Sequence, residues 1–294
     1  MPDSIFEEFS SVYKFINTVN TRPMNEVFKD KDMPSSQKTE YGDNDGELWS
    51  GTRTYKDADD LIAKGWNTGV IEMKQALKVF KRNVILTRNK QRKNICGYAP
   101  SVGDAIIGVP KSMIKTEKRK VLKKQKICRV VYMKSVAESV KASDLMKYGL
   151  TVLKMCMLLD LQNTKTRIDV LPIAVFARGA HSVVAPIITI KDYRQPFNLL
   201  KMAYPIAHVS FLRRHGLRYL ETAPDLHDKW FLNGYGKPLH VLKSYSKKDY
   251  DDTIEKITGK SENTIYIDVD DILRSDCNPY RLAELKGIGI INKK

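Results

Sequence analysis

The chain has 294 residues, enough for one large domain or two ordinary ones with a substantial buried core. Its hydrophobic fraction of 42% argues against intrinsic disorder, and no apolar stretch approaches the roughly 20 residues that a membrane helix needs. The net charge is +16 at pH 7, which indicates a polyanionic partner if it is concentrated in one region.

The first predicted element is a helix over residues 5–19. Ser4 and Glu7 have the spacing of a capping box, and apolar residues recur at helical intervals until Pro23 ends the pattern. Residues 24–48 are polar and rich in turn formers, so they predict a linker. No basic segment followed by an apolar one opens the sequence, and its four cysteines form no C-x-x-C pair. We therefore expect a reduced, cytoplasmic protein.

Residues 49–126 are predicted to be helical and strongly basic. Thr54 and Asp57 have capping-box spacing, Gly65 is a stop signal, and a second helical pattern runs through residues 70–80. The next glycines and prolines indicate an ordered turn region.

The excess charge lies almost entirely in this part of the chain. From Lys74 to Arg129 the sequence has 17 Lys or Arg residues and two acids, whereas the other 238 residues hold 33 basic and 32 acidic groups. On a helix, Ile114, Val121 and Leu122 would share one side and leave the lysines over the rest. A solvated face remains an alternative, although such a face usually includes acids among its lysines. The predicted nucleic-acid-binding residues here are Lys81, Arg82, Arg88, Lys90, Arg92, Lys93, Lys111, Lys115, Lys118, Arg119, Lys120, Lys123, Lys124 and Lys126.

A second basic patch follows further along, in "FLRRHGLRYLE". Arg214 and Arg218 are one helical turn apart, and Phe211 and Tyr219 lie close enough in sequence to stack single-stranded bases. The alternative is that these aromatic residues belong to the core. Because lysine outnumbers arginine in the main basic segment, binding there should contact phosphates without sequence preference and should weaken steeply with salt.

Residues 127–294 predict an α/β core. A strand, a helix and a strand in succession form a β-α-β unit whose strands lie parallel. The predicted elements are a strand at 127–133, a helix at 143–162, strands at 167–177 and 182–190, a helix at 197–221 interrupted near Pro205, and a strand at 264–273. The predicted fold class is α/β, with a parallel-sheet, A-type or Rossmann-like core and a helical N-terminal extension over residues 1–48.

The β-α-β unit resembles the start of von Willebrand factor A-type domains. In that family the first strand ends in D-x-S-x-S, which holds a divalent metal. Here the matching stretch is "MKSVA", where Met133 replaces the aspartate, Ser135 matches the first serine and Ala137 replaces the second. A thioether and a methyl group do not bind a hard cation. The resemblance therefore implies a core without this metal site.

Two other stretches resemble segments of poorly characterised tailed-bacteriophage proteins. These are "GTRTYKDA" at residues 51–58 and "GYAPSV" at residues 97–102. The resemblance implies a phage-encoded protein that acts in the host cytoplasm or in the virion, and it implies no catalytic residue.

Catalytic patterns are weak. The five histidines have no zinc spacing, and "DLHDKW" at residues 225–230 reads as a loop. Asp268 and Asp270 would share a strand face, as nuclease metal ligands can. The final "RLAELKGIGIINKK" resembles the first half of a helix-hairpin-helix DNA module, with Gly287 and Gly289 at its loop; a terminal turn is the alternative.

The sequence leaves two main functional classes open. The first is a non-enzymatic protein that binds nucleic acid, or a complex containing it, through the basic region. The second is a protein-interaction factor, such as a virion assembly component or an inhibitor of a host complex, whose charge contacts an acidic protein surface. A metal-dependent nuclease is a third alternative. We expect no cofactor, no bound metal and no membrane partner.

Overall fold

The computed structural model describes residues 4–25, 28, 35–38, 40–41, 44–77, 87–120, 126–162, 164–176, 182–223, 235–259 and 263–288. The chain forms two compact units. Met1–Lys81 and Ile127–Lys294 make up the first, which we call the core unit, and Arg82–Lys126 make up the second, the hairpin unit.

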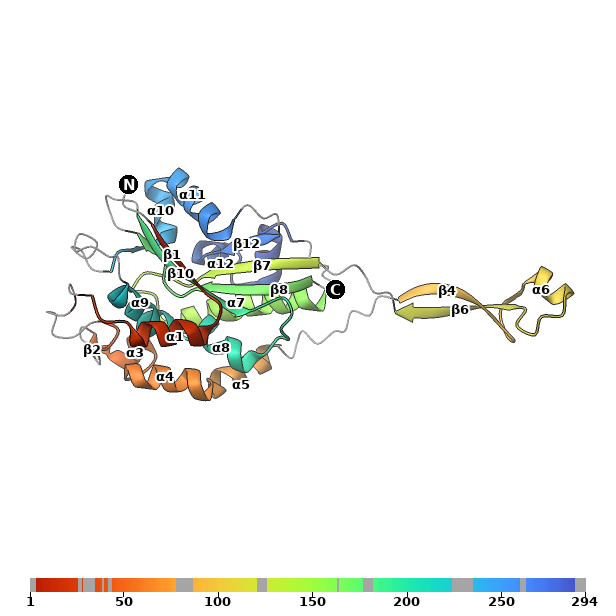
Figure 1. The fold of residues 1–294 in the computed structure, drawn as a ribbon, viewed down its shortest axis with the longest axis horizontal. Helices are drawn as coiled ribbons and strands as arrows, with labels where there is room; N and C mark the ends of the chain where they lie inside the picture. The colour runs from red at the N-terminus through yellow and green to blue at the C-terminus, as the bar shows by residue number, and fades with distance from the viewer. Residues whose placement is uncertain are drawn as a thin grey trace. The chain divides into compact units, whose positions relative to one another are not determined.

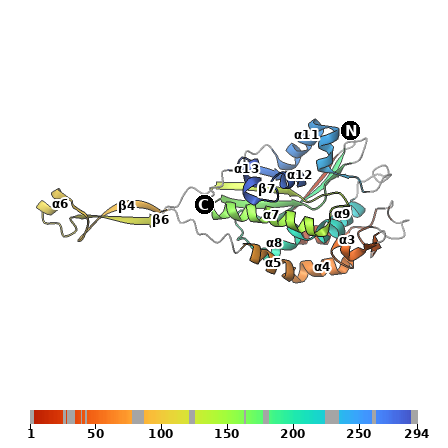
Figure 2. The same cartoon turned by 180° about the vertical axis from the view of Figure 1, so that it is seen from behind.

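The core unit combines helices with one mixed sheet of seven strands (Figures 1 and 2). Its sheet strands are β1 (Ile5–Phe9), β7 (Lys126–Met133), β8 (Thr164–Leu171), β9 (Val175–Phe176), β10 (Val183–Lys191), β11 (Lys237–Pro238) and β12 (Thr264–Ile267). The helices up to residue 161 are α1 (Val12–Thr21), α3 (Gly46–Ser50), α4 (Tyr55–Lys64), α5 (Asn67–Leu77) and α7 (Ala142–Leu161). The later ones are α8 (Leu199–Ala207), the π-helix η2 (Phe211–Gly216), α9 (Leu217–Thr222), η4 (Leu239–Val241), α10 (Leu242–Tyr245), α11 (Lys247–Thr258), α12 (Val269–Arg274) and α13 (Pro279–Leu285). A short pair, β2 (Glu40–Tyr41) and β3 (Asn44–Asp45), precedes α3.

The sheet has the strand order β11-β9-β10-β8-β7-β12, with β1 beside β10. β1 pairs in parallel with β10, and β12 pairs in parallel with β7. β10, however, runs antiparallel to both β8 and β9. The predicted α/β class is therefore confirmed, whereas an entirely parallel sheet is not what forms.

The strands are buried on both faces. Along β7, Val130 and Tyr132 face one apolar cluster, and Val131 and Met133 face a second cluster on the opposite side. Helices α7, α8 and α9 pack on the first face, and α10 and α11 cover the second (Figure 1). This double burial explains why "VVYM", the second half of β7, is a continuous apolar run.

The predicted N-terminal helix is wrong in its first half. Residues 5–9 form β1 and pair with β10, so the N-terminal segment belongs to the sheet and is not a helical extension. The helix begins only at Val12, where Ser11 Oγ accepts a hydrogen bond from the Lys14 amide at 3.2 Å. Its apolar residues fit helical spacing because a strand and the helix after it both face the core.

The helix predicted after Thr54 is confirmed. Thr54 Oγ1 accepts a hydrogen bond from the Asp57 amide, and Asp57 accepts one from the Thr54 amide, which is a complete capping box. Gly65 follows the helix with a φ of 81°, a conformation that favours glycine. The helix predicted through residues 70–80 is found as α5, up to Leu77; Phe80 lies outside the described residues. These helices belong to the core unit.

Within residues 49–126, which were predicted to be helical, the part after α5 forms the hairpin unit instead. It contains β4 (Thr87–Asn94), β5 (Ala99–Pro100), the short helix α6 (Val102–Ile106) and β6 (Met113–Lys120), with β6 paired antiparallel to both other strands. The prediction of helix was wrong here because the few apolar residues of this segment are compatible with either a helix or a strand.

No helix among the described segments has both the length and the apolar character to span a membrane.

Candidate nucleic-acid interface

The main basic segment forms a two-stranded ladder. β4 and β6 pair over eight positions, from Thr87 opposite Lys120 to Asn94 opposite Met113. Each strand contributes four Lys or Arg residues, and Glu117 is the one acid in the two strands together. We call this ladder the stem. It places cations on both strands of an extended ribbon.

Two positions of the stem pair like charges. Arg88 lies opposite Arg119, and Arg92 lies opposite Lys115. Residues directly opposite in an antiparallel ladder share a face, where like charges are destabilising by a fraction of a kcal/mol. An anion bound at these positions would relieve that repulsion.

The loop that joins the strands, residues 95–112, is the tip. A Cβ on Gly97 would lie 2.2 Å from the Ile114 carbonyl oxygen, so only glycine lets the chain cross β6 so closely. The Tyr98 amide donates to that same oxygen at 2.9 Å, and Gln91 Nε2 donates to Tyr98 Oη at 2.7 Å. Pro100 then pairs with Met113. The "GYAPSV" motif is therefore a structural device that turns the ribbon.

Asp104 is the only acid in the tip sequence, and it is already paired. Its carboxylate forms an ion pair with Lys93. Hydrogen bonds from Lys93 and from Ser101 lower the pKa of the Asp104 carboxyl below its usual value. The tip thus presents no uncompensated negative charge to a polyanion.

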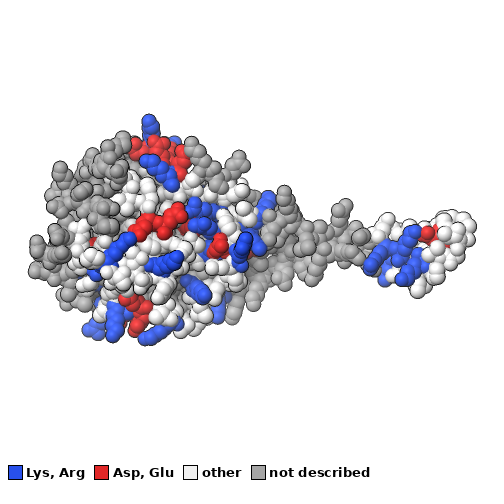
Figure 3. Space-filling view, in the orientation of Figure 1, with Lys and Arg blue, Asp and Glu red and all other residues white. Residues whose placement is uncertain are grey.

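The predicted binding residues divide into three groups. The exposed ones are Arg92, Lys93, Lys111, Lys115 and Lys126. Those located by ladder register are Arg88, Lys90, Lys118, Arg119 and Lys120. Those outside the described residues are Lys81, Arg82, Lys123 and Lys124. Figure 3 shows Lys and Arg gathered on the described part of the hairpin, next to a surface that is uncharged apart from a small acidic area.

The second predicted patch is wrong. Arg214 is fully buried, and Phe211 and Tyr219, proposed to stack bases, are buried too. Arg218 has 14% of its side chain exposed and directs its guanidinium toward Glu221 at 3.9 Å. These residues belong to the core, which was the alternative interpretation of the sequence, and they cannot form a surface for nucleic acid.

Arg214 instead holds backbone carbonyls together. Its guanidinium donates to the carbonyl oxygens of Ser36 at 2.9 Å and Lys38 at 2.7 Å, and to those of Thr52 at 2.8 Å and Arg53 at 3.1 Å. The last two belong to the "GTRTYKDA" stretch. That motif is therefore a partner of the buried arginine, which satisfies carbonyls that would otherwise be buried without a donor.

The next residue in the π-helix, His215, contacts the residue that follows this stretch and also a residue of α8. Its Nε2 lies 2.9 Å from the Asp59 carboxylate, and its Nδ1 lies 3.3 Å from Tyr204 Oη. Burial lowers the pKa of His215, although Asp59 opposes this shift. The imidazole lies inside the core unit, with no exposed surface.

The stretch "MKSVA" is closed as well. Met133, Lys134 and Ser135 are buried. Lys134 Nζ donates to the carbonyls of Pro205 at 3.2 Å and His208 at 2.5 Å, at the C-terminal end of α8. A cation at a helix C-terminus is favourable, although burial lowers the pKa of Lys134 well below its usual value. A buried lysine side chain thus lies in the stretch that a metal motif would occupy.

Asp268 and Asp270 do not share a strand face, because β12 ends at Ile267 and Asp268 is the N-cap of α12. Asp268 Oδ1 accepts from the Asp271 amide at 3.0 Å, and its Oδ2 accepts from Lys243 Nζ at 2.5 Å and Tyr250 Oη at 2.7 Å. Burial alone would raise the pKa of Asp268, but Lys243 and Tyr250 lower it. Both carboxylate oxygens are therefore engaged.

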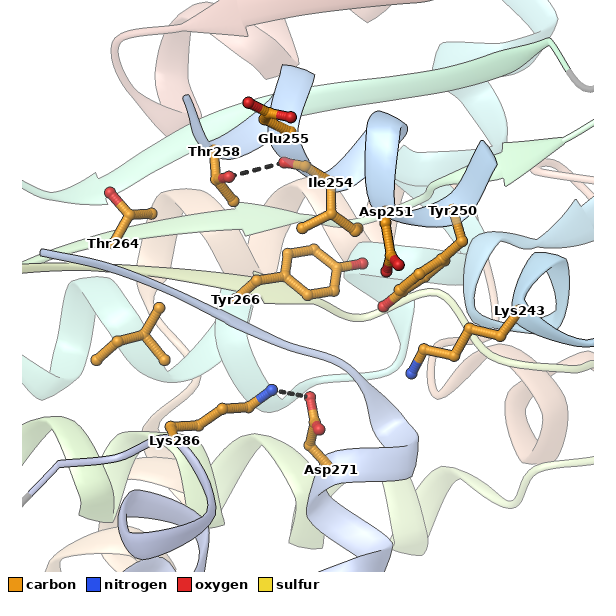
Figure 4. A pocket seen from close by; sticks show the side chains of 11 residues that line it. Lys243, Tyr250, Asp251, Ile254, Glu255, Thr258, Thr264, Tyr266, Asp271 and Lys286 are labelled. Atoms are coloured by element: carbon orange, nitrogen blue, oxygen red, sulfur yellow. Dashed lines mark hydrogen bonds and ion pairs between the residues drawn. The ribbon is translucent and has the colours of Figure 1, made fainter. Parts of the chain in front are cut away.

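A pocket of about 490 Å³ lies next to Asp268, between α11, β12 and α12 (Figure 4). Its two cations are compensated: Lys243 contacts Asp268 and also Asp270 at 3.2 Å, and Lys286 lies 2.5 Å from Asp271. Among the side chains that the structure describes, no three His, Cys, Asp or Glu residues are grouped to hold a metal ion. The arrangement has the character of a structural ion-pair cluster.

The family model of a domain of unknown function, DUF7192, matches residues 3–281. The chain belongs to this family. No curated protein matches the chain, and no solved structure does. The match runs through residues 82–126, so the hairpin unit lies within the DUF7192 domain.

Sequence reasoning missed the tip of this DUF7192 chain. The signal was available: two basic stretches of similar length flank a segment with three glycines and two prolines, which is typical of a hairpin with a long loop. The "DLHDKW" stretch and Gly289 lie outside the described residues.

Proposed function

We propose that this DUF7192 protein binds nucleic acid through the stem, as a non-enzymatic factor that grips the phosphate backbone. The observation that supports this is the charge of the β4–β6 ladder, eight cations and one acid on two paired strands. A surface without a polyanionic partner usually intersperses both signs of charge, because like charges repel across a ladder.

The dimensions of the stem suit a duplex. Eight paired residues extend roughly 27 Å at about 3.4 Å per residue. Over that length double-stranded DNA carries about 16 phosphate charges on its two strands. A two-stranded ribbon also fits the major groove. The net charge of about seven on the stem is therefore comparable to the half of those phosphates that would face it.

The residue types favour backbone contact over base reading. Lysine is a compact charge that suits phosphate, and five of the eight stem cations are lysines. With about six phosphates neutralised, the logarithm of affinity should fall with the logarithm of salt at a slope near −5. The phage origin suggested by "GTRTYKDA" and "GYAPSV" is part of this proposal.

A charge-reversal pair tests the proposal. Lys115→Glu with Arg119→Glu places a carboxylate opposite Arg92 and opposite Arg88, so the ladder gains two opposite-charge pairs and should remain folded. The matched control is Lys56→Glu with Lys201→Glu, two exposed lysines of the core unit.

The assay is fluorescence anisotropy with a labelled duplex and a labelled single strand across a salt series. We expect the wild type and the control to bind, and the stem variant to bind at least about 10-fold more weakly with a shallower salt slope. Absence of wild-type binding at low salt, or equal weakening in the control, would contradict the proposal. A stoichiometric protein complex that survives high salt would support the protein-interaction alternative.

A further inference from the structure

The tip carries a concentration of exposed apolar side chains. Of the 14 large hydrophobic residues that are exposed among those described, six lie in the tip. They are Ile95, Tyr98, Val102, Ile106, Ile107 and Val109. The two most exposed, Ile106 at 79% and Ile107 at 74%, are adjacent at the end of α6. Apolar groups gathered in this way on an otherwise polar ribbon mark a contact surface.

The backbone of the tip can be covered by a partner without leaving the following amides unpaired. Its backbone amides are bonded internally: the Ser101 amide donates to the Ser112 carbonyl at 2.6 Å, and Ala105 donates to Ser101 at 2.9 Å. The Ile107 amide donates to Gly103 at 3.3 Å, and Val109 donates to Asp104 at 2.9 Å. Contact with an apolar partner would therefore leave these donors satisfied.

The hairpin lacks burial of its own. Between residues 91 and 116, where side chains are described, every residue is exposed or only partly buried. A ribbon of two strands without a packed face is marginally stable in water. A partner that covers the tip would supply the missing burial.

We propose that the tip is a wedge that enters the base stack of the duplex whose phosphates the stem grips, with Ile106 and Ile107 as its leading residues. This inference rests on the proposed function, because the stem must first hold the tip against the duplex. Apolar side chains that enter between base steps unstack them and kink the helix, and isoleucine is one of the residue types that serve as such wedges.

The charge pattern along the hairpin matches a nucleic acid. Phosphates form the outside of a duplex and the apolar faces of the bases its inside. On the hairpin, Arg92, Lys111 and Lys115 are exposed cations, and Ile106 and Ile107 are exposed apolar residues at the end of α6. The cations would thus meet the phosphates while the isoleucines reach the stacked bases.

A lipid surface fits the tip less well. Interfacial membrane segments favour Trp, Phe and Leu, and the tip has none of them between residues 95 and 112. Its one aromatic residue, Tyr98, is tied back to the stem by Gln91. The carboxylate of Asp104, which lies within α6 itself, would also have to approach the hydrocarbon.

The test compares a wedge variant, Ile106→Ser with Ile107→Ser, with a control, Leu200→Ser with Leu273→Ser, which changes two exposed leucines of the core unit. Nicked circular DNA is ligated in the presence of each protein, and the linking number is read on a gel after the protein is removed. Energy transfer between dyes at the two ends of a short duplex measures bending. Fluorescence anisotropy measures the fraction of DNA that is bound, so that the variants are compared at equal occupancy of the DNA.

We expect the wild type and the control to change the linking number and raise the energy transfer in proportion to occupancy. The wedge variant should keep the salt slope of the wild type but cause neither effect. If the wild type binds with a steep salt slope yet causes no unwinding or bending, the wedge is wrong and the proposed function stands. If the wild type does not bind DNA, both fail. Flotation with vesicles containing phosphatidylserine that requires Ile106 and Ile107 would overturn the wedge and identify a lipid contact.

Discussion

Replacing Arg214 with methionine should strongly destabilise the core unit. Methionine is of similar length and apolar, so the change removes the guanidinium with little loss of volume. Four carbonyl oxygens, those of Ser36, Lys38, Thr52 and Arg53, lose their donor at once. Each hydrogen bond to a charged donor contributes about 1.5–3 kcal/mol net, but the four are not additive, and relief of the buried charge offsets part of the loss.

We estimate a net loss of about 4 kcal/mol in the free energy of unfolding, a large share of the roughly 5–15 kcal/mol of a typical domain. Urea unfolding followed by tryptophan fluorescence measures it, and Trp49, whose ring lies 5.0 Å from the Arg213 guanidinium carbon, reports on this part of the core. Arg214→Lys keeps the charge but has one nitrogen for four acceptors, so it should lose an intermediate amount.

A loss below about 1 kcal/mol in Arg214→Met would refute the view that these carbonyls depend on the guanidinium. The same variant separates structure from binding. Because Arg214 is buried, the folded variant should bind DNA with the affinity of the wild type. If the folded variant no longer binds DNA, Arg214 contributes to the nucleic-acid interface after all.

Three further predictions follow from single residues. Gly97→Ala should abolish hydrogen-exchange protection of the Tyr98 amide, because the new Cβ would clash with the Ile114 backbone. The control Gly103→Ala, where a Cβ has open space, should keep that protection. Equal protection in both variants would contradict the close approach of the two chain segments. Burial, together with Lys134 and His215, lowers the pKa of His208 to about 3. The unfolded chain takes up this proton near pH 6.5 and the folded chain does not, so stability should fall by about 1.4 kcal/mol per pH unit below about pH 6. His208→Gln should remove that slope in urea unfolding, and a parallel pH dependence would refute the assignment. Asp268→Ala should lower the free energy of unfolding by about 3 kcal/mol, because it removes the α12 cap and leaves Lys243 and Tyr250 without this acceptor. Thermal unfolding measures the loss. An unchanged stability would show that the cluster does not stabilise the fold.

The elements that could be predicted are those whose signals are local. The strand at 127–133 and the helix at 143–162 appear as β7 and α7, and the capping box at Thr54 begins α4. The class of fold followed from their order along the chain.

The errors arise where a distant partner decides the structure. Residues 5–9 form a strand because they pair with β10, which lies about 180 residues later. The hydrophobic periodicity of residues 5–9 alone does not reveal that pairing. Arg214 reads as a surface cation because its four acceptors are backbone atoms, which no side-chain pattern reveals. In the stem, sequence identified the charge but not the ribbon that carries it.

The pairing of distant segments has a consequence for synthesis on the ribosome. β1 must wait for β10, about 180 residues later, and β7 must wait for β12, about 130 residues later, before either gains its parallel neighbour. The central sheet is thus completed only after most of the chain has been made. The two strands of the stem lie within residues 87–120 and need no later residue to pair with each other. The element that we propose to grip phosphates can therefore form while the rest of the protein is still being translated.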